Sequence, residues 1–253
     1  MSGHSHWAKV KRAKSVTDAR RGKIWSKLAK RIIVTAKAGG GNPEENLALR
    51  YAIDEAKGAN MPNDTIDKAI KKGTGELGAV SYENVVYEGY GPGGVAFLID
   101  CLTDNRNRTA PEMRKAFERA GGQLGSSNCV AWMFEKKGSF VVAAEKADED
   151  TLMEIALEAG GDDVRREGDL FEITCEVGSF SAVRQALADR GVETVSGEIA
   201  MVPSNTVTVG ADKARKVLRL MEALEEHEDV QGVYANFDIP DEIMTQAEEE
   251  TAG

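Results

Sequence analysis

Residues 139–203 read SFVVAAEKADEDTLMEIALEAGGDDVRREGDLFEITCEVGSFSAVRQALADRGVETVSGEIAMVP, and this stretch decides the fold class of the chain. Short apolar runs alternate in it with amphipathic segments. We expect four strands and two helices, at 140–145, 148–159, 164–166, 170–176, 180–190 and 198–202. The resulting order, βαββαβ, is that of the ferredoxin-like motif. Residues 139–203 are therefore predicted to fold as one complete α/β unit.

The sequence on either side of this unit predicts the parts of a second one. Before it we expect strands at 84–88 and 95–102, a helix from the capping box at Thr109 to Gly121, and a strand at 129–134. After it we expect a strand, a helix and a last strand, at 206–209, 211–226 and 230–239. We therefore predict a discontinuous α/β domain of 82–136 plus 206–239, with 139–203 inserted into it and an acidic, loose tail at 240–253.

A glycine-rich segment, GYGPGG at 89–94, lies between the first two of these strands. It formally matches the dinucleotide-binding pattern GxGxxG. That pattern needs a helix after the glycines, whose N-terminus faces the phosphate. Here an apolar strand follows, so we interpret the glycines as a hairpin loop.

The residues upstream of 82 are helical in pattern. The spacing predicts helices over about 18–37, over 42–59 with Asn42 as N-cap, and from Pro62 to Gly73, followed by a hinge at 73–81. Leu47, Leu49, Ala52, Ile53 and Ala56 are expected to form the buried side of the second helix. Together with residues 1–17 these helices make a basic arm and helical domain at 1–80. The fold class is thus α+β: an N-terminal three-helix domain followed by two ferredoxin-like α/β sandwich domains, one inserted in the other.

Charge is strongly segregated along the chain. The first forty residues contain eleven Lys or Arg and one Asp, a net charge of +10, whereas the whole chain carries −10. The other 213 residues therefore carry −20. Such segregation is typical of a protein that contacts a polyanion with one end.

The basic segment has two parts. Residues 3–16 show no period and are expected to be an arm that becomes ordered on a partner. In the helix that follows, Ile24, Trp25, Leu28 and Ile32 share one face. The basic side chains fall on the opposite face, which we expect to be solvated: Arg20, Lys23, Lys27, Lys30 and Lys37. Trp7 and Trp25 are candidates for stacking on bases, although Trp25 could equally belong to the core.

A second candidate site is TDNRNRT at 103–109. One interpretation is a well-capped loop whose Asn and Asp side chains bind backbone amides. The other is an anion-binding corner, in which Arg106, Arg108 and the N-terminus of the following helix converge. The residues alone leave both open.

Other classes of function find little support in the residues. No paired catalytic carboxylates and no nucleophile beside a base are evident, so we expect no enzyme and no cofactor. Cys101, Cys129 and Cys175 have neither metal-site nor disulfide spacing, and Ser2-Gly3-His4 would bind copper or nickel only incidentally, so no metal site is expected. No apolar run is long enough to cross a membrane, and the N-terminus has no secretory signal. We expect a cytoplasmic protein with no membrane contact and no small-molecule substrate.

Several motifs stand in one order along the chain: GHSHW at 3–7, RRGKIWSKL at 20–28, NMPNDTIDKAIKKG at 60–73, YEGYGPGG at 87–94 and TDNRNRT at 103–109. With them the chain closely resembles the YebC/PmpR family, which includes the mitochondrial translational activator of cytochrome oxidase subunit one. The resemblance implies a helical N-terminal domain and two α/β domains. The chain departs from the family at His6, where Lys is common, and at Asn128-Cys129-Val130, where Gly-Ser-Val is common.

The resemblance implies a non-enzymatic regulator of gene expression that contacts nucleic acid. Bacterial members are commonly described as DNA-binding transcriptional regulators, whereas other members look like ribosome-associated translation factors that act at difficult sequences such as proline runs. Both alternatives require contact with a polyanion. The candidate nucleic-acid-binding residues are Lys9, Lys11, Arg12, Lys14, Arg20, Arg21, Lys23, Lys27, Lys30, Arg106 and Arg108.

Overall fold

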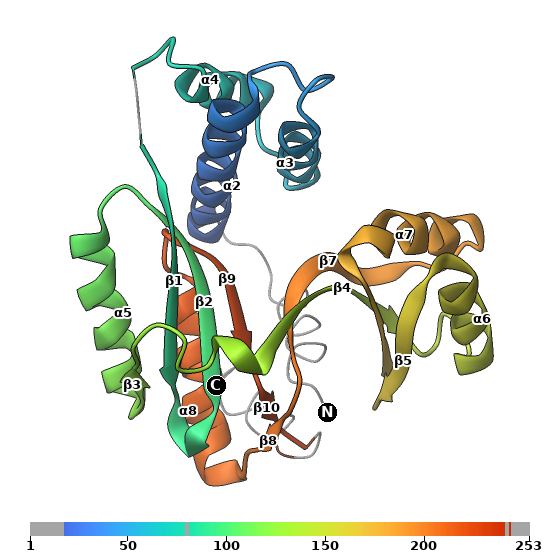
Figure 1. The fold of residues 1–253 in the computed structure, drawn as a ribbon. Helices are drawn as coiled ribbons and strands as arrows, with labels where there is room; N and C mark the ends of the chain where they lie inside the picture. The colour runs from blue at the N-terminus through green and yellow to red at the C-terminus, as the bar shows by residue number, and fades with distance from the viewer. Residues whose placement is uncertain (1–17, 79–80, 241–242, 244–253) are drawn as a thin grey trace.

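The structure is a computed structural model of the chain, and it describes residues 18–78, 81–240 and 243. It confirms the α+β fold class. A unit of helices comes first and is followed by two antiparallel four-stranded sheets (Figure 1). We call the sheet formed by β1, β2, β3 and β9 sheet A and the sheet formed by β4 to β7 sheet B.

The helical unit consists of α2 (Asp18–Gly39), α3 (Leu47–Gly58) and α4 (Asn63–Gly73). Helix α2 packs on both of the others. The unit has a hydrophobic core of its own, which includes Leu28, Ile32, Leu49, Ile53 and Ile66. As the 3.6-residue period of the sequence predicts, the apolar face of each helix points into this core.

Helix α3 begins four residues later than the sequence indicates. Its N-cap is Asn46 rather than Asn42, and the Asn46 side chain accepts a hydrogen bond from the Leu49 amide at 3.1 Å. The same side chain donates to the carbonyls of Thr35 and Gly40 at the end of α2, which fixes where α3 can start. Leu47, expected in the core, is instead the first residue of α3, and it is 56 % exposed.

Sheet B has the predicted ferredoxin-like order. It contains β4 (Phe134–Ala143), β5 (Gly161–Glu167), β6 (Leu170–Cys175) and β7 (Thr194–Pro203) in the order β5-β6-β4-β7, with every pair antiparallel. Helices α6 (Glu149–Ala159) and α7 (Phe180–Asp189) pack on one face of it. The split βαβ arrangement predicted from 139–203 is therefore confirmed in its strand order.

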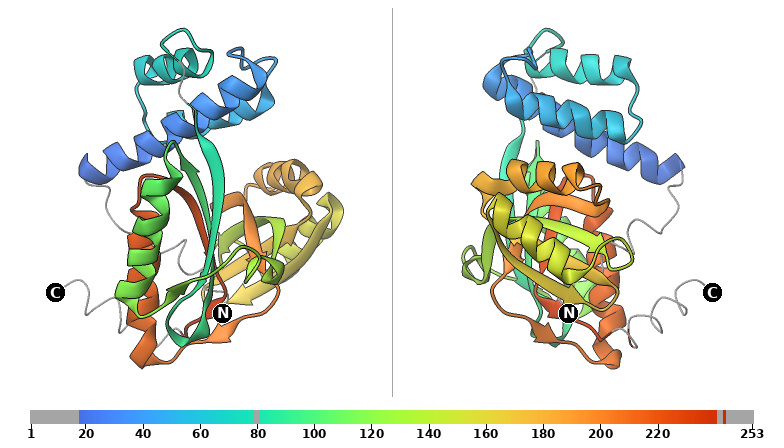
Figure 2. Two further views of the ribbon diagram at one scale, coloured as in Figure 1. Left: turned by 60° about the vertical axis from the view of Figure 1, so that its left-hand side comes forward. Right: turned by 90° about the vertical axis from the view of Figure 1, so that its right-hand side faces the viewer.

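Sheet A contains β1 (Glu83–Tyr90), β2 (Ala96–Thr103), β3 (Gln123–Leu124) and β9 (Val230–Ala235) in the order β3-β1-β2-β9. Strands β1 and β2 pair as an antiparallel hairpin across the glycine-rich loop, as expected. Helices α5 (Arg106–Ala120) and α8 (Ala211–Glu225) lie side by side on one face (Figure 2). Numbered along the chain, the strands of sheet A stand in the order 3-1-2-4 and those of sheet B in the order 2-3-1-4. The two orders coincide when β2 is counted as the first strand of sheet A, β3 as the second, β1 as the third and β9 as the fourth. The domain boundaries given above stay a prediction.

The strand expected at 129–134 is wrong. Residues Ala131–Met133 form a 3₁₀ turn, and the edge strand of sheet A is the shorter β3. The buried carboxylate of Glu88 accepts hydrogen bonds from the amides of Asn128, Val130 and Ala131, at 2.6, 2.8 and 2.7 Å. These amides curl around one acceptor and so cannot form a strand ladder. Asn128 adopts a φ of 65°, which suits Asn or the Gly that is common there in the resembling family.

The last expected strand, 230–239, is broken in two. Asn236 is buried between β9 and β10 (Phe237–Asp238), and its side-chain oxygen accepts a hydrogen bond from the Ala96 amide at 2.7 Å. After this break β10 leaves sheet A and pairs in parallel with β8 (Val207–Thr208).

Candidate nucleic-acid interface

The candidate residues divide by position. Lys9, Lys11, Arg12 and Lys14 lie outside the described residues, and of Arg20 only the helical backbone is described. Arg21 is exposed on the first turns of α2 and makes interactions of its own. The remaining candidates are Lys23, Lys27 and Lys30 on α2 and Arg106 and Arg108 on α5, and the structure brings most of these to one place.

Contrary to expectation, Lys23, Lys27 and Lys30 of α2 are in contact with another part of the chain, whereas Lys37 is exposed as expected. These three lysines lie over the C-terminal end of α8 and follow one another along α2 at intervals of about one helical turn. Lys23 Nζ is 3.5 Å from Glu226 Oε2, and Lys27 Nζ donates to the Glu225 carbonyl at 2.5 Å. Lys30 Nζ donates to the Glu228 carbonyl at 3.1 Å and to Asp229 Oδ1 at 2.5 Å. The helical unit therefore docks on sheet A's helices through its basic stripe.

Trp25 belongs to the helical unit rather than to an exposed stacking surface. Its ring packs, partly buried, against the core of the unit, and its Nε1 donates to the carbonyl of Ala59 at 3.0 Å. The side chain of Trp7 lies outside the described residues.

Asp229, just before β9, is the centre of this junction. Its side chain is 1 % exposed and accepts hydrogen bonds from Lys30 of α2, from Arg108 and Thr109 of α5, and from Thr103 at the end of β2. Burial alone would raise the pKa of this carboxyl, but the hydrogen bonds from Lys30, Arg108 and Thr109 outweigh it and hold the pKa below its ordinary value. One carboxylate thus ties the helical unit to two elements of the sheet A unit.

The TDNRNRT segment serves the same junction. Helix α5 begins at Arg106, three residues before the expected capping box, because Asn105 is the N-cap and accepts from the Arg108 amide at 3.2 Å. Arg108 contacts Asp229 at 2.9 Å and Asp104 at 3.1 Å, so the anion at this corner is a carboxylate of the chain itself. Arg106 is exposed and lies 3.8 Å from Glu83. Features of both interpretations are therefore present: Asn105 caps the helix, and Arg108 binds a carboxylate at its N-terminal end.

Other exposed cations were not singled out by sequence reasoning. They lie on α4, α5 and α8 and form no ion pair within the described residues: Lys68, Lys71, Lys72, Arg114, Lys115, Arg119, Lys213, Lys216 and Arg219. Their signal in the sequence is weak in α4 and α8, where acidic residues leave a net charge of only +1 in each helix, and stronger in α5, which has five basic and two acidic residues. Only the fold shows that α5 and α8 share a surface.

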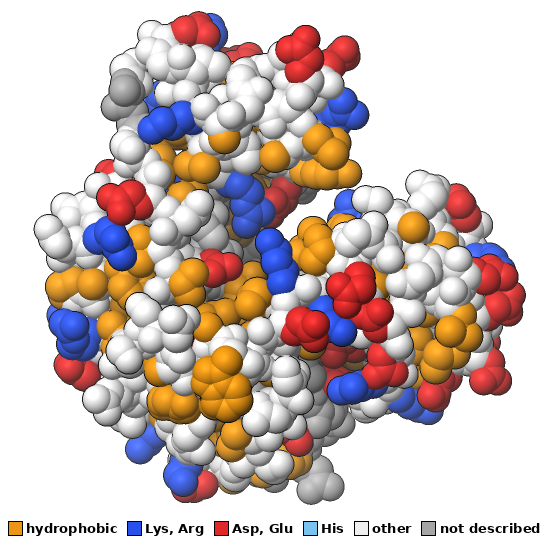
Figure 3. All heavy atoms as spheres, viewed as in Figure 1, with side chains coloured by type: hydrophobic (Ala, Val, Ile, Leu, Met, Phe, Trp, Pro, Cys, Tyr) orange, Lys and Arg blue, Asp and Glu red, His pale blue; other side chains and the backbone are white. Residues whose placement is uncertain are grey.

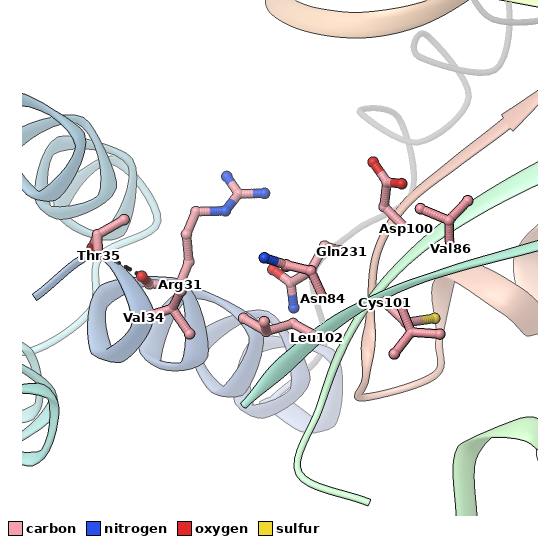
Figure 4. Close-up of a pocket in the computed structure, with 10 residues that line it drawn as sticks. Arg31, Val34, Thr35, Asn84, Val86, Asp100, Cys101, Leu102 and Gln231 are labelled. Atoms are coloured by element: carbon pink, nitrogen blue, oxygen red, sulfur yellow. Dashed lines mark hydrogen bonds between the residues drawn. The ribbon is translucent and has the colours of Figure 1, made fainter. Parts of the chain in front are cut away.

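A cleft separates α2 from the face of sheet A that α5 and α8 leave uncovered. Figure 3 shows the surface hollowed between the helical unit at the top and the sheet B unit at the right. The cleft has a volume of about 280 Å³, and Arg31 and Val34 of α2 face Asn84, Asp100 and Gln231 of the sheet across it (Figure 4). Arg31 forms an ion pair with Glu55 of α3.

The titratable groups of the cleft offer no reactive nucleophile. Burial raises the pKa of Asp100, an effect that nearby Lys136 partly offsets. Burial, together with the negative charge of Asp229 and Asp100, raises the pKa of Cys101 to about 12, so this residue is a thiol at neutral pH. Within the described part of the chain, no group of three or more His, Cys, Asp or Glu side chains is placed to hold a metal.

Comparison with known proteins gives the family. The model of the TACO1/YebC N-terminal domain matches residues 5–76, and the model of the second and third TACO1/YebC domains matches residues 82–237. The chain belongs to the TACO1/YebC family. The predicted resemblance is thereby confirmed over nearly the whole length.

Members of the TACO1/YebC family with similar sequences are named as regulators. A probable transcriptional regulatory protein of Pelotomaculum thermopropionicum is 55 % identical over 243 residues, covering 95 % of this chain and all of the relative. A protein of the same name from Halothermothrix orenii is 54 % identical and covers 99 % of this chain and all of the relative. The crystal structure of a conserved hypothetical protein from Aquifex aeolicus is 46 % identical, with a TM-score of 0.78 over 90 % of this chain and 94 % of that one.

The family thus supports a role in regulation, and the names of these relatives do not describe a catalysed reaction. Among the described helices, none combines the length and the apolar character that crossing a bilayer requires.

Proposed function

We propose that this protein is a non-enzymatic, nucleic-acid-binding regulator of gene expression in the cytoplasm, and that its partner is duplex DNA. The observation that supports this most is the segregation of charge, because a chain of net charge −10 carries +10 in its first forty residues. Relatives named as probable transcriptional regulatory proteins support the same class.

The mode of binding follows from the residue types. Lysine and arginine side chains neutralise phosphates and displace counterions, which gives affinity that falls steeply with salt. Phosphate contacts position a protein on nucleic acid without reading its sequence. We therefore expect weak sequence preference. Because three α2 lysines already contact α8, the arm before α2 is the first point of contact.

The test compares two sets of four charge-neutralising substitutions. The first set is Lys9→Gln, Lys11→Gln, Arg12→Gln and Lys14→Gln in the arm. The control set is Lys57→Gln, Lys68→Gln, Lys71→Gln and Lys72→Gln, four exposed lysines of the helical unit with the same total charge. Binding of a short labelled duplex is measured by fluorescence anisotropy over a series of salt concentrations. We expect only the arm variant to bind more weakly, and its log–log salt slope to decrease by about 3–4.

Equal weakening by both sets would show that net charge rather than the arm drives binding, and no binding by the unaltered protein would overturn the proposal. Sedimentation with ribosomes, with excess duplex as competitor, identifies the partner. Pelleting with ribosomes despite the duplex would assign the protein to translation instead.

A further inference from the structure

The face of α2 that carries Lys23, Lys27 and Lys30 contacts a surface of anionic and carbonyl oxygens. Lys23, Lys27 and Lys30 contact, within the last turn of α8 and the loop after it, two carboxylates and two backbone carbonyls. The C-terminal end of a helix carries partial negative charge on its unpaired carbonyls. The side chains of Glu225, Glu226 and Glu228 add to that charge. The lysines therefore meet a row of anionic oxygens, which is also what a phosphodiester backbone would present.

Among the described residues, the other contacts of the helical unit with the rest of the chain lie close to its covalent connection: Tyr82 packs against its core and under Lys30, and Lys37 Nζ lies 3.4 Å from Ser81 Oγ. The core of the helical unit is separate from the core between sheet A and its helices, and the cleft of about 280 Å³ lies between α2 and the sheet. The covalent connection is the segment between α4 and β1, in which Gly75 and Gly78 have φ values of 89° and 91°. The Lys23–Glu226 pair, in which both side chains are more than 40 % exposed, is of the kind that is weak and screened by salt, whereas the Lys30–Asp229 pair is largely buried.

Release of α2 would leave no orphaned charge in the interior. Lys30 is the donor to Asp229 that comes from the helical unit, whereas Arg108, Thr103 and Thr109 all belong to the sheet A unit. Asp229 therefore keeps three donors when α2 leaves. The heavy cost of an unpaired buried carboxylate does not oppose undocking.

We propose that the C-terminal end of α8 is an intramolecular competitor of nucleic acid for Lys23, Lys27 and Lys30. This inference rests on the function proposed above and names the regulation of that binding surface. In the docked form α8 occupies the lysines, and phosphates replace it when the helical unit swings away. Because only the undocked form binds, whatever weakens the α8 contact strengthens nucleic-acid binding, by the same factor at most, when the docked form predominates.

The test removes charge from the competitor. The variant Glu226→Gln with Glu228→Gln weakens the end of α8. The control Glu118→Gln with Glu145→Gln changes the net charge equally, at exposed positions away from α2. Affinity for a short labelled duplex is measured by anisotropy. We expect the α8 variant to bind about three- to tenfold more tightly and the control to change by less than about twofold.

A second measurement follows docking without nucleic acid. Lys23, Lys27 and Lys30 are labelled with an amine-reactive ester and quantified by mass spectrometry, with exposed Lys57 and Lys68 as internal references. In the α8 variant, or at high salt, the three α2 lysines should react faster while the references stay constant.

The outcomes separate the two proposals. Tighter binding with faster labelling supports competition. Duplex binding that is unchanged, or equally changed in both variants, overturns competition and leaves the proposed function standing. Absence of duplex binding in every protein overturns both, whatever the labelling shows.

Discussion

At the scale of single residues, two buried carboxylates each gather several hydrogen bonds, one in the turn before β4 and the other at the candidate interface. Glu88 accepts hydrogen bonds from three backbone amides of the turn before β4. Asp229 accepts hydrogen bonds from side chains of α2, α5 and β2. Hydrogen bonds to an ionised acceptor are the strong ones, and a buried acceptor that loses them is costly. Both residues are therefore sensitive points for substitution.

Glu88→Gln should destabilise the protein by about 2–3 kcal/mol, because the amide that replaces one carboxylate oxygen cannot accept from the backbone amides facing it. The free energy of unfolding in urea measures this. Exposed Glu118→Gln is the matched control and should change it by less than about 0.5 kcal/mol. A Glu88→Gln protein as stable as the control would show that the turn does not depend on the carboxylate.

Asp229→Asn should lower the free energy of unfolding by about 2–4 kcal/mol at neutral pH. The folded-state pKa of Asp229 lies below its ordinary value of 3.8, so its stabilising effect is present above that pH and is lost as pH falls through the lower folded pKa. The difference between the unaltered protein and the variant should therefore shrink below about pH 4. Urea unfolding at a series of pH values tests the sign.

Asp104→Asn is the control for Asp229, because Asp104 also contacts Arg108 but is 48 % exposed. Its effect should stay below about 1 kcal/mol. A difference between Asp229→Asn and the unaltered protein that does not vary with pH would assign the loss to packing instead of charge.

The residue types of this interface could be predicted from sequence, but their partners could not. The basic positions of α2 follow from helical spacing. The carbonyls that Lys27 and Lys30 contact, at the end of α8 and in the loop after it, lie 198 residues away in sequence, and no local pattern relates the two segments. The expectation of a solvated face was wrong for Lys23, Lys27 and Lys30, because a charged helix face can contact charged groups of the protein as well as water.

At the scale of elements, the helical unit depends on close approach of α2 and α4. A Cβ placed on Gly73 would lie 2.5 Å from the Ile33 carbonyl oxygen and 2.7 Å from the Ala36 Cβ. Both neighbours are atoms of α2 with no freedom to move away. The glycine at the end of α4 therefore permits the crossing of the two helices.

Gly73→Ala should destabilise the helical unit by about 1–3 kcal/mol through this overlap. Gly58→Ala, at the end of α3, meets nothing within 4 Å and should stabilise the protein by up to about 1 kcal/mol. Circular dichroism during thermal unfolding compares the two. Equal midpoints for both variants would mean that α2 and α4 can separate without cost.

Most elements follow from periodicity, and the exceptions have local causes. The two-residue and 3.6-residue periods predict most strands of both sheets and the helices that cover them, and the ferredoxin-like order along the chain is found in sheet B. Periodicity fails at 129–134 because a side chain from β1 captures the backbone amides, and at 230–239 because Asn236 turns the chain out of the sheet. In the first case the polar side chain comes from another strand and in the second it belongs to the segment itself, and in both it overrides an apolar local pattern.

At the scale of the whole molecule, the described residues form separate hydrophobic cores in the helical unit, beside sheet A and beside sheet B. We expect calorimetric unfolding that is not two-state, with a measured enthalpy larger than the van't Hoff enthalpy. The helical unit, held by ion pairs, should melt at a temperature that falls as salt rises. A single transition with equal enthalpies at every salt concentration would contradict this.

The pairing of Phe134 with Pro203 in β4 and β7 has a consequence for the history of the chain. Cα atoms of paired antiparallel residues lie about 4.5–5.5 Å apart, so the stretch between them leaves and re-enters the rest of the molecule at one point. A gene could acquire or exchange the whole stretch in a single recombination event, and a short turn could replace it. If 139–203 is an inserted domain, as the sequence predicts, its sequence can diverge while β1, β2, β3 and β9 keep their order.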